Sequence, residues 1–273
     1  MTQTETLTAT QMDTRAEGWL RAAQSLWFGL TILGQWTFVY FIVAYYFGAT
    51  WTGEFARWNH KPLITGHVPG DLSGNLVFAG HVIMAAVMTA GGTLQLIPQL
   101  RERAAGFHRW NGRFFLITAV LLATGGLYLV WVRGSYLNLT TALGITVNAL
   151  LIITFAILTV RLAMQRDIDA HRRWALRTFM VANGVWMLRV GMMFWAVTTR
   201  GAGMTRNMSG PFDLFWIFGC YLVPLAGLEA YLWVRSSGGV MTKWAMSGAL
   251  FVFSLFIGIG SVAAYLLMWG PYI

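Results

Sequence analysis

Five histidines and the arginines near them are the residues of this 273-residue chain that could bind a metal or a cofactor. Two stretches, HRWNGRFF from His108 and HRRWALRTF from His171, share the pattern Arg-Trp-x-x-Arg with a histidine just upstream. Histidine is a common ligand of haem iron and of metal ions. His60 and His67, seven residues apart in a Pro- and Gly-rich stretch, have a poor spacing for a metal. The single cysteine, Cys220, excludes an intramolecular disulfide and gives no support to a cysteine-based metal site.

The repeated motif places charged and aromatic side chains on one face of a helix. In the first copy Trp110 and Arg113 are three residues apart, a spacing at which helical side chains are neighbours. An interfacial belt would explain the Trp and Arg without any ligand, because both residue types suit the lipid head-group region. It explains the histidines less well, so lipid anchoring and haem binding both stay open. The candidate cofactor-binding residues of the two copies, with the histidines as iron ligands, are His108, Arg109, Arg113, His171, Arg173 and Arg177.

Two further candidates, His81 and Arg189, lie inside apolar stretches. His81 is about 25 Å of helix from the inner end of its predicted span, so it cannot share a metal with His108. Arg189 lies about 18 Å along a helix from Arg177, past the middle of the bilayer. A charge at that depth faces the bundle interior, a partner or a water-filled cavity. Arg189 therefore either forms a structural ion pair, for which Glu229 is the available acid, or anchors a ligand.

The composition indicates that lipid surrounds most of the chain. Hydrophobic residues make up 57% and charged residues 11%, against about 25% charged in soluble domains. We expect an all-α integral membrane protein, because a segment in lipid must satisfy its own backbone hydrogen bonds. A polar N-terminal tail, 1–22, should precede a single transmembrane helical domain, 23–273, with about seven helices. The predicted spans are 24–48, 77–100, 114–132, 142–163, 178–199, 212–234 and 245–269.

The net charge of +9 is explained by membrane topology, and no nucleic-acid partner is needed. With a cytoplasmic N-terminus, thirteen of the 19 basic residues fall on the inner side, five on the outer side and Arg189 within a span. The inner residues are Arg15, Arg21, Arg101, Arg103, Arg109, Arg113, Arg161, Arg166, Arg172, Arg173, Arg177, Arg235 and Lys243. The outer residues are Arg57, Lys61, Arg133, Arg200 and Arg206.

These motifs resemble a prokaryotic membrane-protein family catalogued as a domain of unknown function, number 2306. The resemblance runs from His81 through GGTLQLIPQLRERAAGFHRWNGR to DIDAHRRWALRTFMVANGVWMLR and covers about residues 75–235. It implies a helical protein of the prokaryotic inner membrane and no particular activity. The first and last spans and the outer loop 49–76 are additions to this core. The matching residues are His81, Gln95, Pro98, Arg101, His108, Arg109, Trp110, Gly112, Arg113, His171, Arg172, Trp174, Arg177 and Arg189.

A looser similarity is to the cytochrome b561 type of membrane protein, in which a four-helix core holds two b haems by histidine pairs. His108 and Gly112 match the start of a helix in that pattern. Because helices pair alternately there, the similarity implies one inner-face haem between His108 and His171. His81 lacks a histidine partner in the fourth span, where Asn148 is the nearest polar residue, so a second haem is not implied.

Three functions remain open on the sequence alone. The first is a redox protein with a b haem between His108 and His171, which exchanges electrons with a quinone. The second is a non-catalytic accessory or assembly subunit of a membrane complex. The third is a small-molecule transporter with Arg189 and Glu229 on its path, although the sequence shows neither an inverted repeat nor paired broken helices. A hydrolase or a nucleotide-dependent enzyme is not indicated, because no such motif is present; whether the protein is an enzyme stays open.

Overall fold

The computed structural model describes residues 3–60 and 65–273 and shows a helical membrane protein. In these residues six helices are long and apolar enough to cross a membrane, and a bent helix pair makes a seventh candidate span. The predicted fold class is therefore confirmed. The helices are α1 (Gln3–Ile42), α2 (Gly48–Trp51), α3 (Leu72–Gln95), α4 (Pro98–Arg103), α5 (Ala105–Trp131), α6 (Leu139–Met164), α7 (Ile168–Ala182), α8 (Gly184–Thr199), α9 (Pro211–Ser237) and α10 (Val240–Ala264).

Two predicted spans differ from the helices that form. The second, predicted over 77–100, ends at Gln95, and a separate short helix, α4, begins at Pro98. Proline lacks an N–H and pushes the residue before it out of the helical region. Ile97 accordingly adopts extended backbone angles, φ −79° and ψ 111°. The chain therefore turns before it reaches Arg101.

The fifth span, predicted as one helix over 178–199, is broken at Asn183 into α7 and α8, which meet at 52°. The amide of Asn183 donates to the carbonyl of Phe179 (2.8 Å), one turn earlier. Asparagine competes in this way with the regular helix ladder. The glycine that follows, Gly184, allows close packing, since a Cβ there would lie 3.1 Å from Asn148 and from Tyr221.

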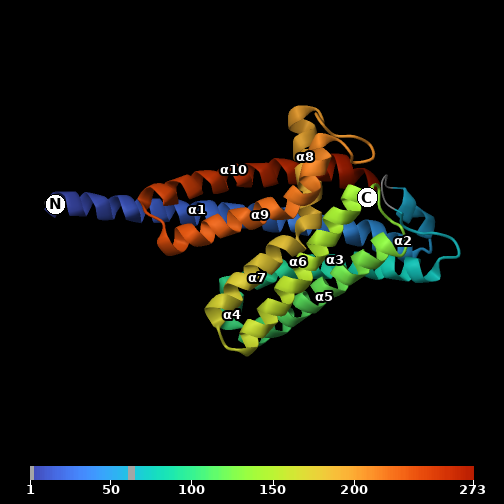
Figure 1. Cartoon of the computed structure of the whole chain (residues 1–273), viewed down its shortest axis with the longest axis horizontal. Coiled ribbons are helices and arrows are strands. Elements are labelled where there is room, and N and C mark those ends of the chain that lie inside the picture. The colour runs from blue at the N-terminus through green and yellow to red at the C-terminus, as the bar shows by residue number, and fades with distance from the viewer. Residues whose placement is uncertain (1–2, 61–64) are drawn as a thin grey trace.

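The helices form two groups that diverge toward one end of the molecule (Figure 1). One group contains α1, α9 and α10; the other is a four-helix bundle of α3, α5, α6 and α7. The N-terminus, α4 and the α6–α7 and α9–α10 turns lie where the groups diverge, which we call the basic end (Figure 1). The opposite end, with residues 52–60, 65–71, 132–138 and 200–210, is the loop end. The side of the membrane that each end faces stays a prediction.

The polar tail predicted over 1–22 is helical from Gln3 on and belongs to α1. Ala16 and Leu20 are buried, and α1 packs along α10. The charged residues Asp13 and Glu17 of this segment both accept hydrogen bonds from Lys243 of α10 (2.7 and 3.0 Å). Ion pairs therefore tie the start of α1 to the start of α10.

Each helix group has its own hydrophobic core. The core where α1 meets α8, α9 and α10 is aromatic and includes Phe38, Tyr46, Trp186, Trp216 and Trp269. The core inside the four-helix bundle is aliphatic apart from Phe115 and Phe179. Its remaining members are Met88, Ala119, Leu122, Ala123, Ala149, Ile152, Val181 and Ala182.

Arg133 connects the chain segments of the loop end. Its guanidinium donates to Asp71 (2.8 Å), to the amide oxygen of Asn75 (2.8 Å) and to the backbone oxygen of Gly66 (2.9 Å). The Arg133 side chain is 6% exposed. The sequence placed Arg133 on the outer side only as one of five charges, and the structure shows that it holds the long loop onto α3. Lys61, another of the five, lies outside the described residues.

The Asp71 carboxylate makes the stability of the loop end depend on pH. Asp71 caps α3 by accepting from the backbone N–H of Gly74 (2.8 Å), and this bond, followed by Arg133, lowers the pKa of Asp71 below its usual value of 3.8. A carboxyl with a lower pKa when folded stabilises the fold above its unfolded pKa, and this contribution is lost as the pH falls through the folded value. We therefore expect the melting temperature to decrease when the pH is lowered below about 4.

Thermal unfolding in detergent between pH 6 and pH 3 tests this expectation. Asp71→Asn should flatten the acid limb of the curve, whereas Glu54→Gln, at an exposed i,i+3 ion pair with Arg57, should retain it. An unchanged acid limb in Asp71→Asn would show that other carboxyls cause the acid sensitivity.

Candidate functional site

The two motif histidines occupy equivalent places at the basic end. His108 is the fourth residue of α5 and His171 is the fourth residue of α7. Each closes the first turn of its helix, since its backbone N–H donates to the residue four earlier, Ala104 (3.0 Å) or Asp167 (2.9 Å). The two rings lie close enough for a charge on His171 to act on His108. The repeat in the sequence is therefore a repeat of helix starts at one level of the bundle.

The helices that carry these histidines are diagonal partners. Within the bundle α3 packs on α5, α5 on α6 and α6 on α7. The first and last helices of this series, α3 and α7, meet at Gly92 of α3. An added Cβ there would lie 2.9 Å from Phe115 of α5 and 3.3 Å from Phe179 of α7. The two histidines therefore lie at the same end of the bundle core, on diagonal helices and beyond the layer that Phe115 and Phe179 fill.

The orientation of the His171 ring is set by the neighbouring helix. Its Nδ1 lies 2.9 Å from the backbone oxygen of Thr159 on α6. A carbonyl oxygen only accepts, so Nδ1 is the donor in this bond, and Nε2 is the ring nitrogen left for another partner. Beside this contact the buried hydroxyls of Thr159 and Thr178 bond to each other (3.0 Å) and fix α6 against α7. A hydrogen bond to the other ring nitrogen is the usual way in which a metal-binding imidazole is oriented.

Polar side chains of α3 and α5 position His108. The Gln95 amide donates to the backbone oxygen of His108 (3.0 Å), and the Asn111 amide donates to that of Gly91 (2.8 Å). Both bonds join the end of α3 to the start of α5. The turn at Pro98 between them also brings Arg101 within electrostatic reach of the His108 ring. The His108 ring is half-buried.

The Trp and Arg of each motif contact one another, as their spacing predicts. The Arg113 guanidinium lies 5.1 Å from the Trp110 ring centre, and that of Arg177 lies 4.8 Å from the Trp174 ring centre. Such cation–π contacts stabilise by about 0.5–1 kcal/mol at exposed positions. Arg109 and Arg173 are exposed, so they are free to meet a ligand or lipid.

Glu229 pairs with Arg177 and not with Arg189. Arg177 donates to both carboxylate oxygens of Glu229 (2.6 and 2.7 Å), which links α7 to α9. The sequence left open an ion pair between Arg189 and Glu229, and that hypothesis is therefore wrong. The sequence placed both residues by depth along straight helices, but the bend at Asn183 carries Arg189 away from α9's basic end.

His81 and Arg189 lie together, apart from the motif histidines. The charge of Arg189 acts on His81 and on Tyr46, and its guanidinium lies 5.4 Å from the Phe38 ring centre. His81 packs on α5 at Gly125, where an added Cβ would lie 3.5 Å from its Nδ1. The structure thus divides the eight candidate residues into six at the basic end and these two within the membrane domain.

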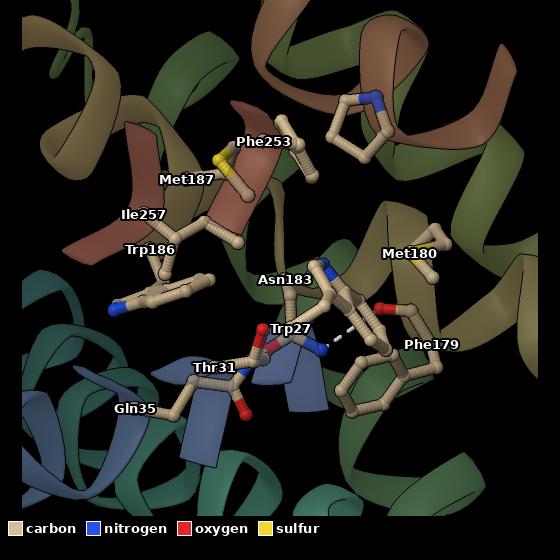
Figure 2. Close-up of a pocket in the computed structure, with 11 residues that line it drawn as sticks. Trp27, Thr31, Gln35, Phe179, Met180, Asn183, Trp186, Met187, Phe253 and Ile257 are labelled. Atoms are coloured by element: carbon tan, nitrogen blue, oxygen red, sulfur yellow. Dashed lines mark hydrogen bonds between the residues drawn. The ribbon is translucent and has the colours of Figure 1, made fainter. Parts of the chain in front are cut away.

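A small cavity of about 20 Å³ lies at the break between α7 and α8 (Figure 2). Its polar lining comes from Thr31 and Gln35 of α1 and from Asn183. Gln35 donates to the Asn183 side chain (3.0 Å), while Thr31 Oγ1 and Gln35 Oε1 have no partner among the described residues. The remaining lining is apolar: Trp27, Phe179, Met180, Trp186, Met187, Pro224, Phe253 and Ile257.

Several residues of these sites were not found from the sequence. The Asn-Gly pair at 183–184 is a turn signal inside an apolar run, so the break had a local signal. The sequence contained no signal for Gln35, Thr159 and Thr178. Isolated polar residues are common in apolar helices, and the partners of these three lie on other helices.

Residues 78–211 match the family described as "Predicted membrane protein (DUF2306)". The match includes both motif histidines, His81 and Arg189, and it confirms the family resemblance that the motifs indicated. No curated protein and no solved structure matches the chain. Nothing in these comparisons therefore supports the looser similarity to the cytochrome b561 type. Together with the apolar helices, the match shows a polytopic protein of the lipid bilayer.

Proposed function

We propose that the protein is a membrane redox protein that binds one b haem between His108 and His171. The observation that supports this most is the equivalent placement of the two histidines, each at the fourth residue of one of two diagonal helices. Histidine is a common ligand of haem iron, so His108 and His171 would be the residues to hold a haem at this end of the bundle. The proposed location is the cytoplasmic membrane of a prokaryote, with the basic end inside.

The donor set fits this cofactor. The Nδ1–H of His171 binds the Thr159 oxygen, which leaves Nε2 available for the iron, and the half-buried His108 lies within electrostatic reach of His171. In the described part of the chain no three His, Cys, Asp or Glu side chains come together as a metal site. Two imidazoles alone suffice for haem iron, whose other four ligands come from the porphyrin.

The surrounding residues would control charge and access. Arg101, Arg109 and Arg173 are exposed cations at the level of the histidines, suited to the haem propionates. Arg177 is committed to Glu229 and serves to join α7 to α9. Phe115 and Phe179 separate the histidines from the rest of the core and exclude water. When bound, the haem would supply one-electron transfer, with a membrane quinone as the proposed partner.

An absorbance spectrum of the detergent-purified protein, oxidised and then reduced with dithionite, tests the proposal together with a pyridine haemochrome assay. A Soret band with sharp reduced α and β bands is the expected result. A colourless protein from haem-replete cells that also fails to bind added haemin would overturn it. The accessory-subunit function would then lead, and co-purifying proteins would be the next observation to make.

The break between α7 and α8 favours a second candidate, small-molecule transport. Discontinuous membrane helices form binding sites in many transporters, because the broken ends expose polar backbone groups. Here the break lies beside Pro224 of α9, which removes a second helical hydrogen bond. Two of the residues around the same cavity, Thr31 and Gln35, each have a buried polar atom without a partner among the described residues.

Cysteine accessibility distinguishes transport from a closed structure. In a Cys220→Ser background, Thr31→Cys should react with a membrane-impermeant thiol reagent from at least one side if the cavity opens to water. Val252→Cys, at an exposed position on α10, should face lipid and stay unlabelled. A folded Thr31→Cys protein that never reacts from either side would exclude a water-accessible path through this cavity.

A further inference from the structure

We infer that the basic end of the helix group α1, α9 and α10 contains a binding site for a phosphate group. A hollow of about 320 Å³ lies there, between the start of α1, the end of α9 and the start of α10. Its lining is mostly polar and comprises Glu17, Arg21, Arg235, Ser236, Ser237, Gly238 and Lys243. It lies on a different helix group from the histidine pair and does not depend on haem binding.

Arg21 and Arg235 are the cations that remain available in this hollow. Lys243 is neutralised by Asp13 and Glu17, whereas neither arginine forms an ion pair with a described acidic side chain. Guanidinium groups bind phosphate oxygens through paired N–H donors, which makes arginine the preferred residue for this group. The two arginines therefore present donors to the hollow, whereas its lining carboxylate, Glu17, accepts from Lys243 (3.0 Å).

A hydrogen bond between helices sets the two arginines opposite each other. Tyr231 of α9 donates to the side-chain oxygen of Gln24 of α1 (2.7 Å). Arg21 lies three residues before Gln24, and Arg235 lies four residues after Tyr231. Because α1 leaves the basic end and α9 approaches it, both arginines lie one turn nearer the surface than this bond, at matching depth.

The turn into α10 completes the hollow. A Cβ at Gly238 would lie 2.6 Å from the Val234 backbone oxygen and 2.7 Å from the Thr242 hydroxyl, so only glycine allows this tight return. The return starts the 25-residue helix α10 directly after the end of α9, so that Lys243 of α10 lines the same hollow as Arg235. Unpaired N–H groups and the helix dipole at such an end add to the attraction for an anion.

Aromatic residues place the hollow at the level of lipid head groups. Trp19 and Trp244 lie within two residues of lining residues of α1 and α10; their rings are 6.2 Å apart, and both are exposed. Exposed tryptophans of membrane proteins concentrate at the membrane–water interface. The phosphate could therefore come from an anionic phospholipid or from a soluble phosphate compound, and the same side chains would bind either.

The double variant Arg21→Gln/Arg235→Gln tests the site, with Arg15→Gln/Arg103→Gln as a control that removes the same charge outside the hollow. Native mass spectrometry would measure retention of phosphatidylglycerol, and thermal unfolding would measure stabilisation by inorganic phosphate against chloride at equal ionic strength. We expect binding to weaken about tenfold or more in the hollow variant, the effect of one lost charge-assisted hydrogen bond, and not in the control.

The two measurements also identify the source of the phosphate. Retained lipid without an effect of inorganic phosphate assigns the site to a lipid head group, and stabilisation by inorganic phosphate assigns it to a soluble compound. Absence of both effects in the wild-type protein, or equal losses in the two variants, would overturn the inference. If the double variant does not fold, Arg235→Gln alone gives the same comparison.

Discussion

Replacing His171 by glutamine is expected to abolish the Soret band and the reduced α and β bands of the purified protein. Glutamine retains a polar side chain of similar length but provides no imidazole for the iron. The hydrogen bond from His171 Nδ1 to the Thr159 oxygen, which orients the ring, is lost with it. Because both axial ligands are needed for a low-spin b haem, His108→Gln should have the same effect. Spectra and haem content per protein measure both.

The controls are the histidines that lie elsewhere. His67→Gln changes a half-buried residue of the loop end, at the opposite end of the molecule from the motif pair, and should leave the spectrum unchanged. His81→Gln should also retain it, because His81 lies with Arg189 and not with the motif pair. Full haem content in either His108→Gln or His171→Gln would contradict ligation by this pair. Loss of haem in His81→Gln alone would move the cofactor to the Arg189 region.

The fold class could be predicted from the sequence because it depends on the hydropathy of whole segments. Apolar runs of about 20 residues define membrane helices whatever their neighbours are. The ends of these helices depend on single residues, such as Pro98, whose effect a hydropathy average conceals. The break at Asn183 also depends on distant contacts, since Gln35, 148 residues away, bonds to its side chain. Such a contact cannot be read from local sequence.

The candidate site could be predicted only where its residues repeat. His108 and His171 were found because the same motif opens two helices, and helix starts at one face of a membrane lie at one level. The cation–π contacts within each motif follow from spacing alone. The sequence offered Glu229 as one possible partner of Arg189, whereas Glu229 pairs with Arg177, because its partner depends on how α7 and α9 cross. Pairing between helices is set by tertiary packing, which spacing along the chain does not determine.

Arg133→Ala is expected to lower the free energy of unfolding by about 3 kcal/mol, the effect of removing one partner from a largely buried ion pair. The change would leave the Asp71 carboxylate, the Asn75 amide oxygen and the Gly66 carbonyl without their shared donor. Because all three belong to the long loop or to the start of α3, the loop should separate from the bundle before the remaining helices unfold. Thermal unfolding in detergent should show a decrease of about 5–10 °C in the melting temperature.

Arg57→Ala is the matched control, because Arg57 is also an arginine of the loop end paired with an acid. Its pair with Glu54 (3.3 Å) is exposed on both sides, at 39% and 57%, so the expected loss is within about 1 kcal/mol. Limited proteolysis separates a local effect from a global one: Arg133→Ala should be cut first within residues 65–71, while Arg57→Ala should resist as the wild type does. Equal melting temperatures for the two variants would show that Arg133 does not hold the loop. The difference between them measures what burial adds to an arginine–carboxylate pair, since the charge removed is the same.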